Sequence, residues 1–373
     1  MPSTETLETA TLDEAERLMT ICNACRYCES MCAVYPAMER RRLFAQADLT
    51  YLANLCHGCQ GCYYACQYAP PNEFGVNVAK TFAQLRAQSY ARYAWPGFLA
   101  RAFDRNGLIV SLAIAFALAL VIGLTFALRD PSVLFAAHTG EGAFYKVIPY
   151  DAMVWPFGLV FLFAICAMIA GGARYWRDTA GRSGARLSSR AVSGGLWDTL
   201  TLKNLGGGGG GCNYPDENFS YARRNFHHFT FYGFMLCFAA TSVATIYDHG
   251  FGWIAPYSFT SAPVILGTLG GIGLIIGPAG LLWLKARAEP APQARDLLGM
   301  DVALLVLLLA IALTGLALLG LRETPAMGTL LAIHLGFVLA LFVTLPYGKM
   351  VHCVYRFLAL IQDAAERKLG NRN

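Results

Sequence analysis

Residues 22–32 read CNACRYCESMC and residues 56–66 read CHGCQGCYYAC, two runs with the same spacing of cysteines. Both follow the pattern C-x2-C-x2-C-x3-C, and a proline, Pro36 or Pro70, stands four residues after the last cysteine. Three closely spaced thiolates can bind three corners of an iron–sulfur cubane, and in two-cluster ferredoxins the fourth cysteine of each run binds the other cluster. The spacing therefore predicts two [4Fe–4S] clusters.

This exchange of the fourth cysteine assigns the metal ligands. The first predicted cluster is bound by Cys22, Cys25, Cys28 and Cys66. The second is bound by Cys56, Cys59, Cys62 and Cys32. Zinc sites use four ligands in two well-separated pairs, which fits two complete runs of four cysteines less well. The N-terminal segment is acidic and lacks the basic start and apolar run of a secretory signal, so metal binding is favoured over disulfides.

The segment between the two runs, residues 37–55, reads AMERRRLFAQADLTYLANL and has helical composition without strand alternation. We therefore expect residues 1–100 to form an α-helical ferredoxin domain rather than a small β-rich one. A pair of clusters transfers electrons, and no nucleophile or acid–base pair stands near the cysteines. The sequence thus predicts an electron-transfer component with no catalytic residue and no substrate-oxidising site of its own.

The rest of the chain has the composition of a membrane domain. Of the 373 residues 56% are apolar and only 14% are charged, which is too apolar for an ordinary soluble protein. Six stretches approach the ~20 apolar residues that cross a bilayer as a helix: 108–128, 154–173, 227–246, 262–284, 298–319 and 327–345. Since backbone groups in lipid must pair within the segment, these stretches are predicted to be helices. The expected fold is mainly α, with a six-helix transmembrane bundle over residues 101–373.

The basic residues predict the orientation. They gather before the first span, in the loop 174–225, between the fourth and fifth spans and after the sixth, whereas the other three loops hold only Arg129, Lys146 and Arg322. Because basic loops stay on the cytoplasmic side, both termini and the clusters are predicted to be cytoplasmic and the spans to lie in the inner membrane. A net charge of +5 whose basic residues lie beside membrane spans does not predict nucleic-acid binding.

Histidines in or beside the spans are candidate haem ligands, because an ionisable residue in a span is rare without a function. The candidates are His227, His228, His334 and His352. The last two are 18 residues apart, so an unkinked helix places them on one face about 27 Å apart. Pro346 and Gly348 also predict a kink between them.

The third and sixth spans run antiparallel, so His227 and His228 share the inner leaflet with His352. An inner b-type haem bound by His352 and one of these two is therefore predicted. A second, outer haem would use His334 and His249, although for His249 an ordinary position at the water interface is favoured.

The loop 205–224 reads LGGGGGGCNYPDENFSYARR and is not a nucleotide-binding loop, because no Gly-Lys-Ser/Thr follows the glycines. It is either a flexible linker or a backbone that lets a partner or cofactor approach closely. In the second case Arg223 and Arg224 could pair with haem propionates or a partner carboxylate. Glycines of the fourth span, among them Gly271 and Gly277, favour close helix packing over contact with a flat cofactor. Cys212 receives no role.

Three long strings carry a family resemblance: LANLCHGCQGCYYACQYAPPNEFGVNV, GGGGGGCNYPDENFSYARRNFHHFTFYGF and LPYGKMVH. They resemble the tricarballylate-utilisation (citrate-utilisation) protein B family over nearly the whole chain. The resemblance implies a membrane iron–sulfur protein that reoxidises the reduced flavin of an FAD-dependent dehydrogenase. That partner oxidises tricarballylate to cis-aconitate, the electrons pass to quinone, and a b-type haem is associated. The membrane half is similar to cytochrome b anchors of the nitrate-reductase gamma type, by analogy of fold only.

Two other functions are compatible with parts of the sequence. One is a cytochrome b and iron–sulfur subunit of a heterodisulfide-reductase-like complex, which would require a thiol-handling partner. The other is a carboxylate transporter or redox sensor whose clusters are structural. Transport is disfavoured because the spans contain few charged residues, Asp301 being one, and no evident inverted repeat.

Overall fold

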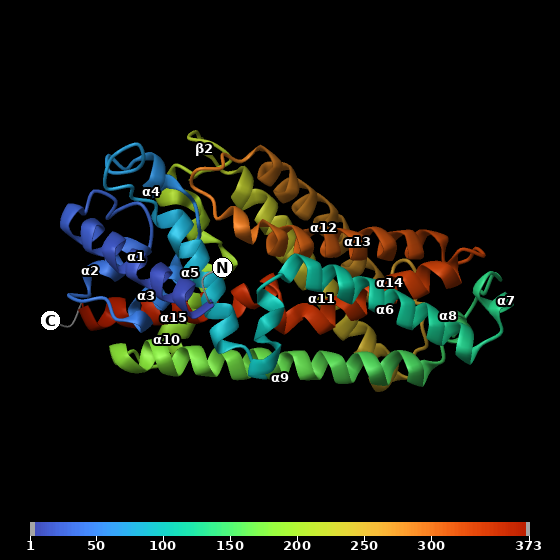
Figure 1. The fold of residues 1–373 in the computed structure, drawn as a ribbon. Helices are drawn as coiled ribbons and strands as arrows, with labels where there is room; N and C mark the ends of the chain where they lie inside the picture. Colours follow the sequence, from blue (N-terminus) through green and yellow to red (C-terminus); the bar gives the residue numbers. More distant parts are fainter. Residues whose placement is uncertain (1–3, 371–373) are drawn as a thin grey trace.

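The computed structural model describes residues 4–370, and its architecture is mainly α-helical, as the sequence predicted. The N-terminal domain is built from short helices joined by the cysteine-bearing turns (Figure 1). Its elements are α1 (Thr4–Cys25), α2 (Val34–Glu39), α3 (Gln46–Leu55), α4 (Gly61–Tyr64), α5 (Val78–Tyr93) and the 3-10 helix η1 (Gly97–Phe103). The segment between the cysteine runs is helical on both sides of a short turn, which agrees with its composition.

The second half contains six helices that are long and apolar enough to cross a membrane, the composition of a multi-pass membrane protein. These helices are α6 (Asn106–Leu128), α9 (Tyr150–Ser183), α11 (Ala222–Phe251), α12 (Ala262–Arg287), α13 (Leu298–Leu321) and α14 (Met327–Thr344). Each contains or overlaps one predicted span. Two short helices, α7 (Pro131–Leu134) and α8 (Ala143–Val147), lie at the end of the bundle away from the N-terminal domain (Figure 1).

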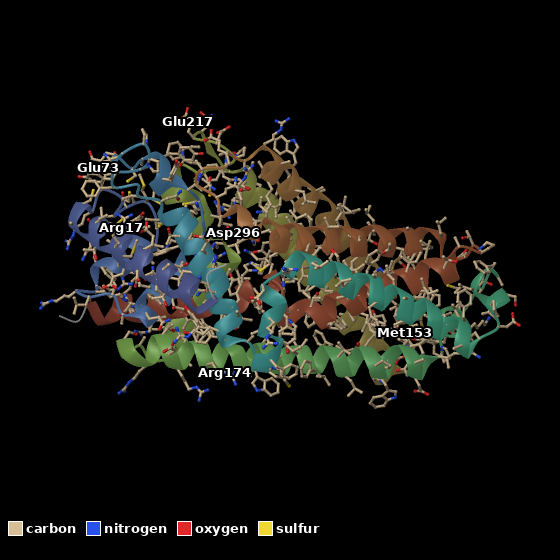
Figure 2. All side chains as sticks on the ribbon, viewed as in Figure 1. Arg17, Glu73, Met153, Arg174, Glu217 and Asp296 are labelled. Atoms are coloured by element: carbon tan, nitrogen blue, oxygen red, sulfur yellow. The ribbon has the colours of Figure 1, made fainter. Side chains whose placement is uncertain are left out.

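The connections α9–α11 and α12–α13 both lie at the end of the bundle that carries the N-terminal domain. The first contains α10 (Ser189–Leu200), η2 (Lys203–Gly209) and the two-stranded antiparallel ribbon β1 (Cys212–Asn213) and β2 (Phe219–Ser220). The second, which contains η3 (Arg295–Leu297), reaches α4 through the hydroxyl of Tyr64, which donates to Glu289 over 2.9 Å. In Figure 2 the labelled Glu73, Glu217 and Asp296 accordingly lie at this end, far from Met153.

The sixth span is interrupted before His352, near Pro346 and Gly348 where a kink was predicted, so the one-face placement that an unkinked helix would give His334 and His352 does not apply. Helix α14 ends at Thr344, and the 3-10 helices η4 (Leu345–Tyr347) and η5 (Lys349–Val351) follow. Gly348 between them is fully extended, because the proline at 346 and the glycine interrupt the helical hydrogen bonds. A new helix, α15 (His352–Gly370), then begins at His352 itself and runs beside the N-terminal domain (Figure 1).

Glycines of α12 allow it to contact α11 backbone to backbone. A Cβ at Gly273 would lie 3.1 Å from both the Phe229 carbonyl oxygen and the Gly233 Cα, and one at Gly270 would lie 2.8 Å from the Gly233 carbonyl oxygen. Larger side chains would therefore separate these helices. The structure supports the helix-packing interpretation of these glycines.

Asp301, at the start of α13, forms two ion pairs. Its carboxylate oxygens lie 2.5 Å from Lys285 Nζ on α12 and 2.7 Å from Lys349 Nζ after α14. The carboxylate thus joins three segments at the same end of the bundle. This structural role leaves Asp301 without the free carboxylate that a transport site would use.

Helix α15 fastens the N-terminal domain to the membrane half through buried ion pairs. Arg40 Nη2 lies 2.5 Å from an Asp363 carboxylate oxygen, and Arg41 Nη2 lies 2.8 Å from one of Glu366. The side chains of Arg41 and Glu366 are only 8% and 7% exposed. Arg41 also pairs with Asp48 over 2.6 Å, so Glu366 completes a buried ion-pair network that specifies how the two halves meet.

Substituting Glu366 with Ala should therefore destabilise the junction, because the buried guanidinium of Arg41 would keep only Asp48, on its own domain, as an ion-pair partner. We expect a loss of about 1.5–3 kcal/mol in the free energy of unfolding of the N-terminal domain, followed by near-ultraviolet circular dichroism in urea. The matched control is Glu14→Ala, which removes the exposed Arg17–Glu14 pair and should cost at most about 1 kcal/mol. Equal effects of the two substitutions would contradict this account.

Candidate functional site

The first cysteine run starts inside α1 and continues in the turn after it. Cys22 and Cys25 belong to the last turn of α1, and Arg26 directly after them has a left-handed backbone with φ of 55°. In the second run Gly58 and Gln60 also have positive φ, 62° and 64°. These reversals turn the chain back on itself between successive cysteines, as wrapping around a compact metal centre requires.

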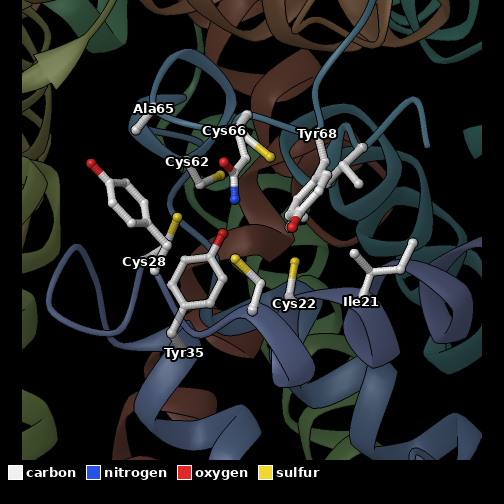
Figure 3. A pocket seen from close by; sticks show the side chains of 13 residues that line it. Ile21, Cys22, Cys28, Tyr35, Cys62, Ala65, Cys66 and Tyr68 are labelled. Carbon is white, nitrogen blue, oxygen red and sulfur yellow. The ribbon is translucent and has the colours of Figure 1, made fainter. Parts of the chain in front are cut away.

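One cavity of about 210 Å³ is lined by the four cysteines predicted for the first cluster and also by Cys62, which is predicted for the second. Figure 3 shows the sulfur atoms of Cys22, Cys28 and Cys66 directed into it. A single water needs only about 10–15 Å³, so this cavity has room for a group of several atoms. The size of this cavity suits a cluster better than a lone metal ion.

Burial and the neighbouring thiolates both raise the pKa values of thiols in the two predicted ligand sets. Burial, with the neighbouring thiolates of Cys28, Cys66 and Cys25, raises the pKa of Cys22 to about 12. Burial, followed by the nearby thiolates of the other predicted second-cluster ligands, raises the pKa of Cys62 well above its ordinary value. Each set of four is thus mutually close. The thiols would stay protonated without metal and would lose their protons on binding it.

Tyr35 on α2 lies between the two sets. Its side chain is only 2% exposed, and its hydroxyl lies close enough to Cys28 of the first set and Cys62 of the second to interact with both. Figure 3 shows this hydroxyl directed toward the sulfur atoms. Sequence reasoning did not single out Tyr35. The only feature of the sequence that could have indicated Tyr35 is its position, three residues after Cys32 and next to Pro36.

The glycine-rich loop packs on the cysteine runs, which argues against a flexible linker. The backbone N–H of Asn213 donates to the carbonyl of Cys59 over 3.0 Å. On the other side, a Cβ at Gly208 would lie 3.2 Å from the carbonyl oxygens of Ser30 and Met31, so the loop approaches the first run as well. Gly208 has φ of 72°, which favours glycine. The loop therefore covers the region where Cys32 and Cys59 meet.

Cys212 in this loop is a residue that the sequence left without a role. Its side chain is fully buried, its thiol donates to the Leu205 carbonyl over 3.2 Å, and it lies close enough to Cys59 to interact with that thiol. Only the tertiary structure brings Cys212 beside the predicted ligand Cys59, because the 152 residues from 60 to 211 separate them in the sequence.

Arg223 and Arg224 have different environments. Arg223 donates to the carbonyls of Gly58 and His57, the second over 3.0 Å, and its guanidinium lies 5.0 Å from the ring centroid of Tyr214. This side chain is therefore occupied by the second cysteine run rather than free for a propionate. Arg224 donates to Thr201 over 2.9 Å, while its buried Nε has no partner and remains available to an anion.

Of the two adjacent histidines on α11, the structure places His227 against His352. The ring centroids lie 6.4 Å apart with the planes at 83°. Two imidazoles on opposite sides of one iron have centroids about 6–6.5 Å apart, since each metal–nitrogen bond is about 2 Å. His352 Nδ1 lies 2.6 Å from the Lys349 carbonyl, which orients the ring as in many metal-bound histidines and leaves Nε2 free. His228 instead packs on Tyr232, with ring centroids 5.8 Å apart.

His227 and His352 are the residues that would hold a b-type haem at the end of the bundle beside the N-terminal domain. The outer pair is not brought together in the described residues. His334 Nδ1 lies 3.1 Å from the hydroxyl of Thr314 on α13. His249 is exposed and lies 3.8 Å from its neighbour Asp248. The interfacial interpretation of His249 is therefore favoured.

Comparison with known proteins identifies both halves. A family model described as the Citrate utilization protein B Fer4-like domain matches residues 15–92, and one described as Citrate utilization protein B matches residues 101–372. The chain belongs to the citrate utilization protein B family.

The resemblance noted from the sequence is thus confirmed. Citrate utilization protein B of Escherichia coli is 49% identical over 360 residues, covering 96% of this chain and 93% of the relative. No solved structure matches the chain. The family model that matches residues 15–92 describes the N-terminal domain, which carries both cysteine runs, as a ferredoxin-like iron–sulfur domain.

The exchanged ligand sets can be tested with serine substitutions. Cys25→Ser and Cys66→Ser should alter the same electron paramagnetic resonance signal of the reduced protein, because both residues line the first cavity. Cys32→Ser should alter the other signal. Cys166→Ser, at an exposed position on α9, is the control and should leave both signals and the iron content unchanged. If Cys66→Ser altered the signal that responds to Cys32→Ser, the assignment would be wrong.

Proposed function

We propose that this protein carries electrons in the inner membrane, from the reduced flavin of a cytoplasmic dehydrogenase to quinone. Two [4Fe–4S] clusters and a b-type haem would each accept and release one electron at a time, so that two-electron flavin chemistry is converted into single-electron steps. The protein's own residues would bind these groups, hold them at fixed separations and exclude water. None of the described residues is proposed to act on the oxidised substrate.

The observation that carries this proposal is a continuous path of contacts. Tyr35 links the first cysteine set to the second, as described above. Arg223 on α11 then contacts the second run at Gly58. His227 follows Arg223 by four residues, about 6 Å along the same helix, and faces His352. The predicted redox sites therefore form a series that leads from the N-terminal domain into the bundle.

The donor and its substrate are inferred from the family. The name of the Escherichia coli relative refers to citrate utilization, and the family resemblance implies an FAD-dependent tricarballylate dehydrogenase. We propose a flavoprotein that oxidises a tricarboxylate and docks on the N-terminal domain. The substrate would bind that partner rather than this chain. The basic loops at the same end of the bundle support a cytoplasmic position for both termini.

Substituting Cys59 with Ser should abolish electron transfer while leaving membrane insertion intact, because this residue lies on the path between the cysteine sets and α11. The measurement is quinone-dependent reoxidation of the reduced dehydrogenase flavin in membranes that hold equal amounts of each variant. Cys166→Ser is again the control and should retain full activity. Full activity of the Cys59 variant would disprove the relay.

The haem ligands can be separated by histidine substitutions. His227→Ala and His352→Ala should each remove the b-type α-band from the reduced optical spectrum, because their rings face each other. His228→Ala should retain the band, since this ring packs on Tyr232 instead. A purified wild-type protein with clusters but no α-band would show that the histidine pair has another role.

A further inference from the structure

Three arginines from three different helices converge on the backbone of the second cysteine run. Arg86 of α5 donates to the Cys56 carbonyl over 2.8 Å and to Ala53 over 2.9 Å. Arg356 of α15 donates to the same Cys56 carbonyl over 2.8 Å. Arg223 of α11 donates to the carbonyls of His57 and Gly58. We call Arg86, Arg223 and Arg356 the arginine triad.

The triad has no carboxylate partner. The ion pairs found within residues 4–370 include none of its three members. Yet Arg86 is only 8% exposed, and guanidinium groups stay protonated in proteins. Charges buried without counter-ions are costly. An anion bound beside Cys56 would remove this cost, and a cluster held by four thiolates carries net negative charge.

The surroundings of the first run differ. The arginine within it, Arg26, is exposed and donates to the Asn23 carbonyl over 3.1 Å. The carboxylate of Glu39 lies close enough to Arg26 and to Glu29 to interact with both. The cavity of the first set is also lined by Tyr27, whose side chain is 69% exposed. The positive charge is therefore concentrated, and most buried, at the second set.

We propose that the arginine triad raises the reduction potential of the second cluster above that of the first, and so directs electrons toward the membrane. Reduction adds one negative charge to a cluster, and nearby positive charge favours the reduced form. In the step itself the first cluster loses one electron and the second gains it, with no proton transferred. This inference depends on the proposed function in one respect, that both cysteine sets hold clusters.

Two members of the triad belong to the membrane half, which gives the arrangement a further consequence. Arg223 and Arg356 reach Cys56, His57 and Gly58 only because α11 and α15 pack against the N-terminal domain. The second cluster would therefore reach its working potential only in the assembled chain.

The test is a redox titration of the purified full-length protein, followed by electron paramagnetic resonance. The second cluster's signal is identified as the one altered by Cys59→Ser. In the wild type it should titrate at the higher potential. Arg223→Gln and Arg356→Gln should lower that potential and leave the other cluster's potential unchanged. Arg223→Lys keeps the positive charge and should therefore lower the potential much less than Arg223→Gln. Arg26→Gln is the matched control beside the first run and should leave the second cluster's potential unchanged.

Each outcome bears on the proposal. Arg86 is buried, so its variants can fail to fold, and Arg223→Gln with Arg223→Lys is therefore the decisive pair. Unchanged potentials in Arg223→Gln, or equal shifts of both clusters, would overturn the role of the triad. A wild type whose second cluster has the lower potential would also overturn it, even if flavin reoxidation is normal. A wild type with a single cluster would overturn the relay as well.

Discussion

The carboxyl end of α3 is the point on which the arrangement depends. A helix leaves its last carbonyls without partners in the helix and carries partial negative charge there. Here the carbonyls of Ala53, Asn54 and Cys56 accept hydrogen bonds from Arg86 and Arg356. The same contacts place positive charge at the start of the second cysteine run and attach the N-terminal domain to α15. The hydrogen bonds that satisfy the last carbonyls of α3 therefore also join the N-terminal domain to the membrane half.

The membrane half supports this junction by close helix packing. Glycines of α12 hold α11 at backbone contact, and α11 in turn carries Arg223 to the second run and His227 to His352. The glycine-rich loop before α11 can lie flat on both runs because several of its residues have positive φ. A side chain at these positions would separate the loop from the cysteines. Packing in the bundle and the geometry of the iron–sulfur domain are therefore coupled.

Much of the fold followed from local pattern. The six apolar stretches are six helices, and the segment between the cysteine runs is helical, because hydrophobicity and composition act within one segment. The histidine pair was only partly predictable: the antiparallel spans place His352 in one leaflet with His227 and His228, but which ring faces it depends on the rotation of α11. The break in the sixth span at Pro346 and Gly348 was predicted from the sequence, but the extended backbone of Gly348 and the new helix that begins at His352 were not.

The sequence alone determined the kind of protein: two four-cysteine runs specify the metal chemistry through their spacing, and six apolar stretches specify a membrane domain through their length. Tertiary structure alone decided what surrounds the cysteines. Tyr35 between the sets, Cys212 beside Cys59, and the arginine triad come from segments up to 300 residues apart. No spacing rule connects such residues, because their proximity is produced by helix packing and by the need to pair buried charges and carbonyls.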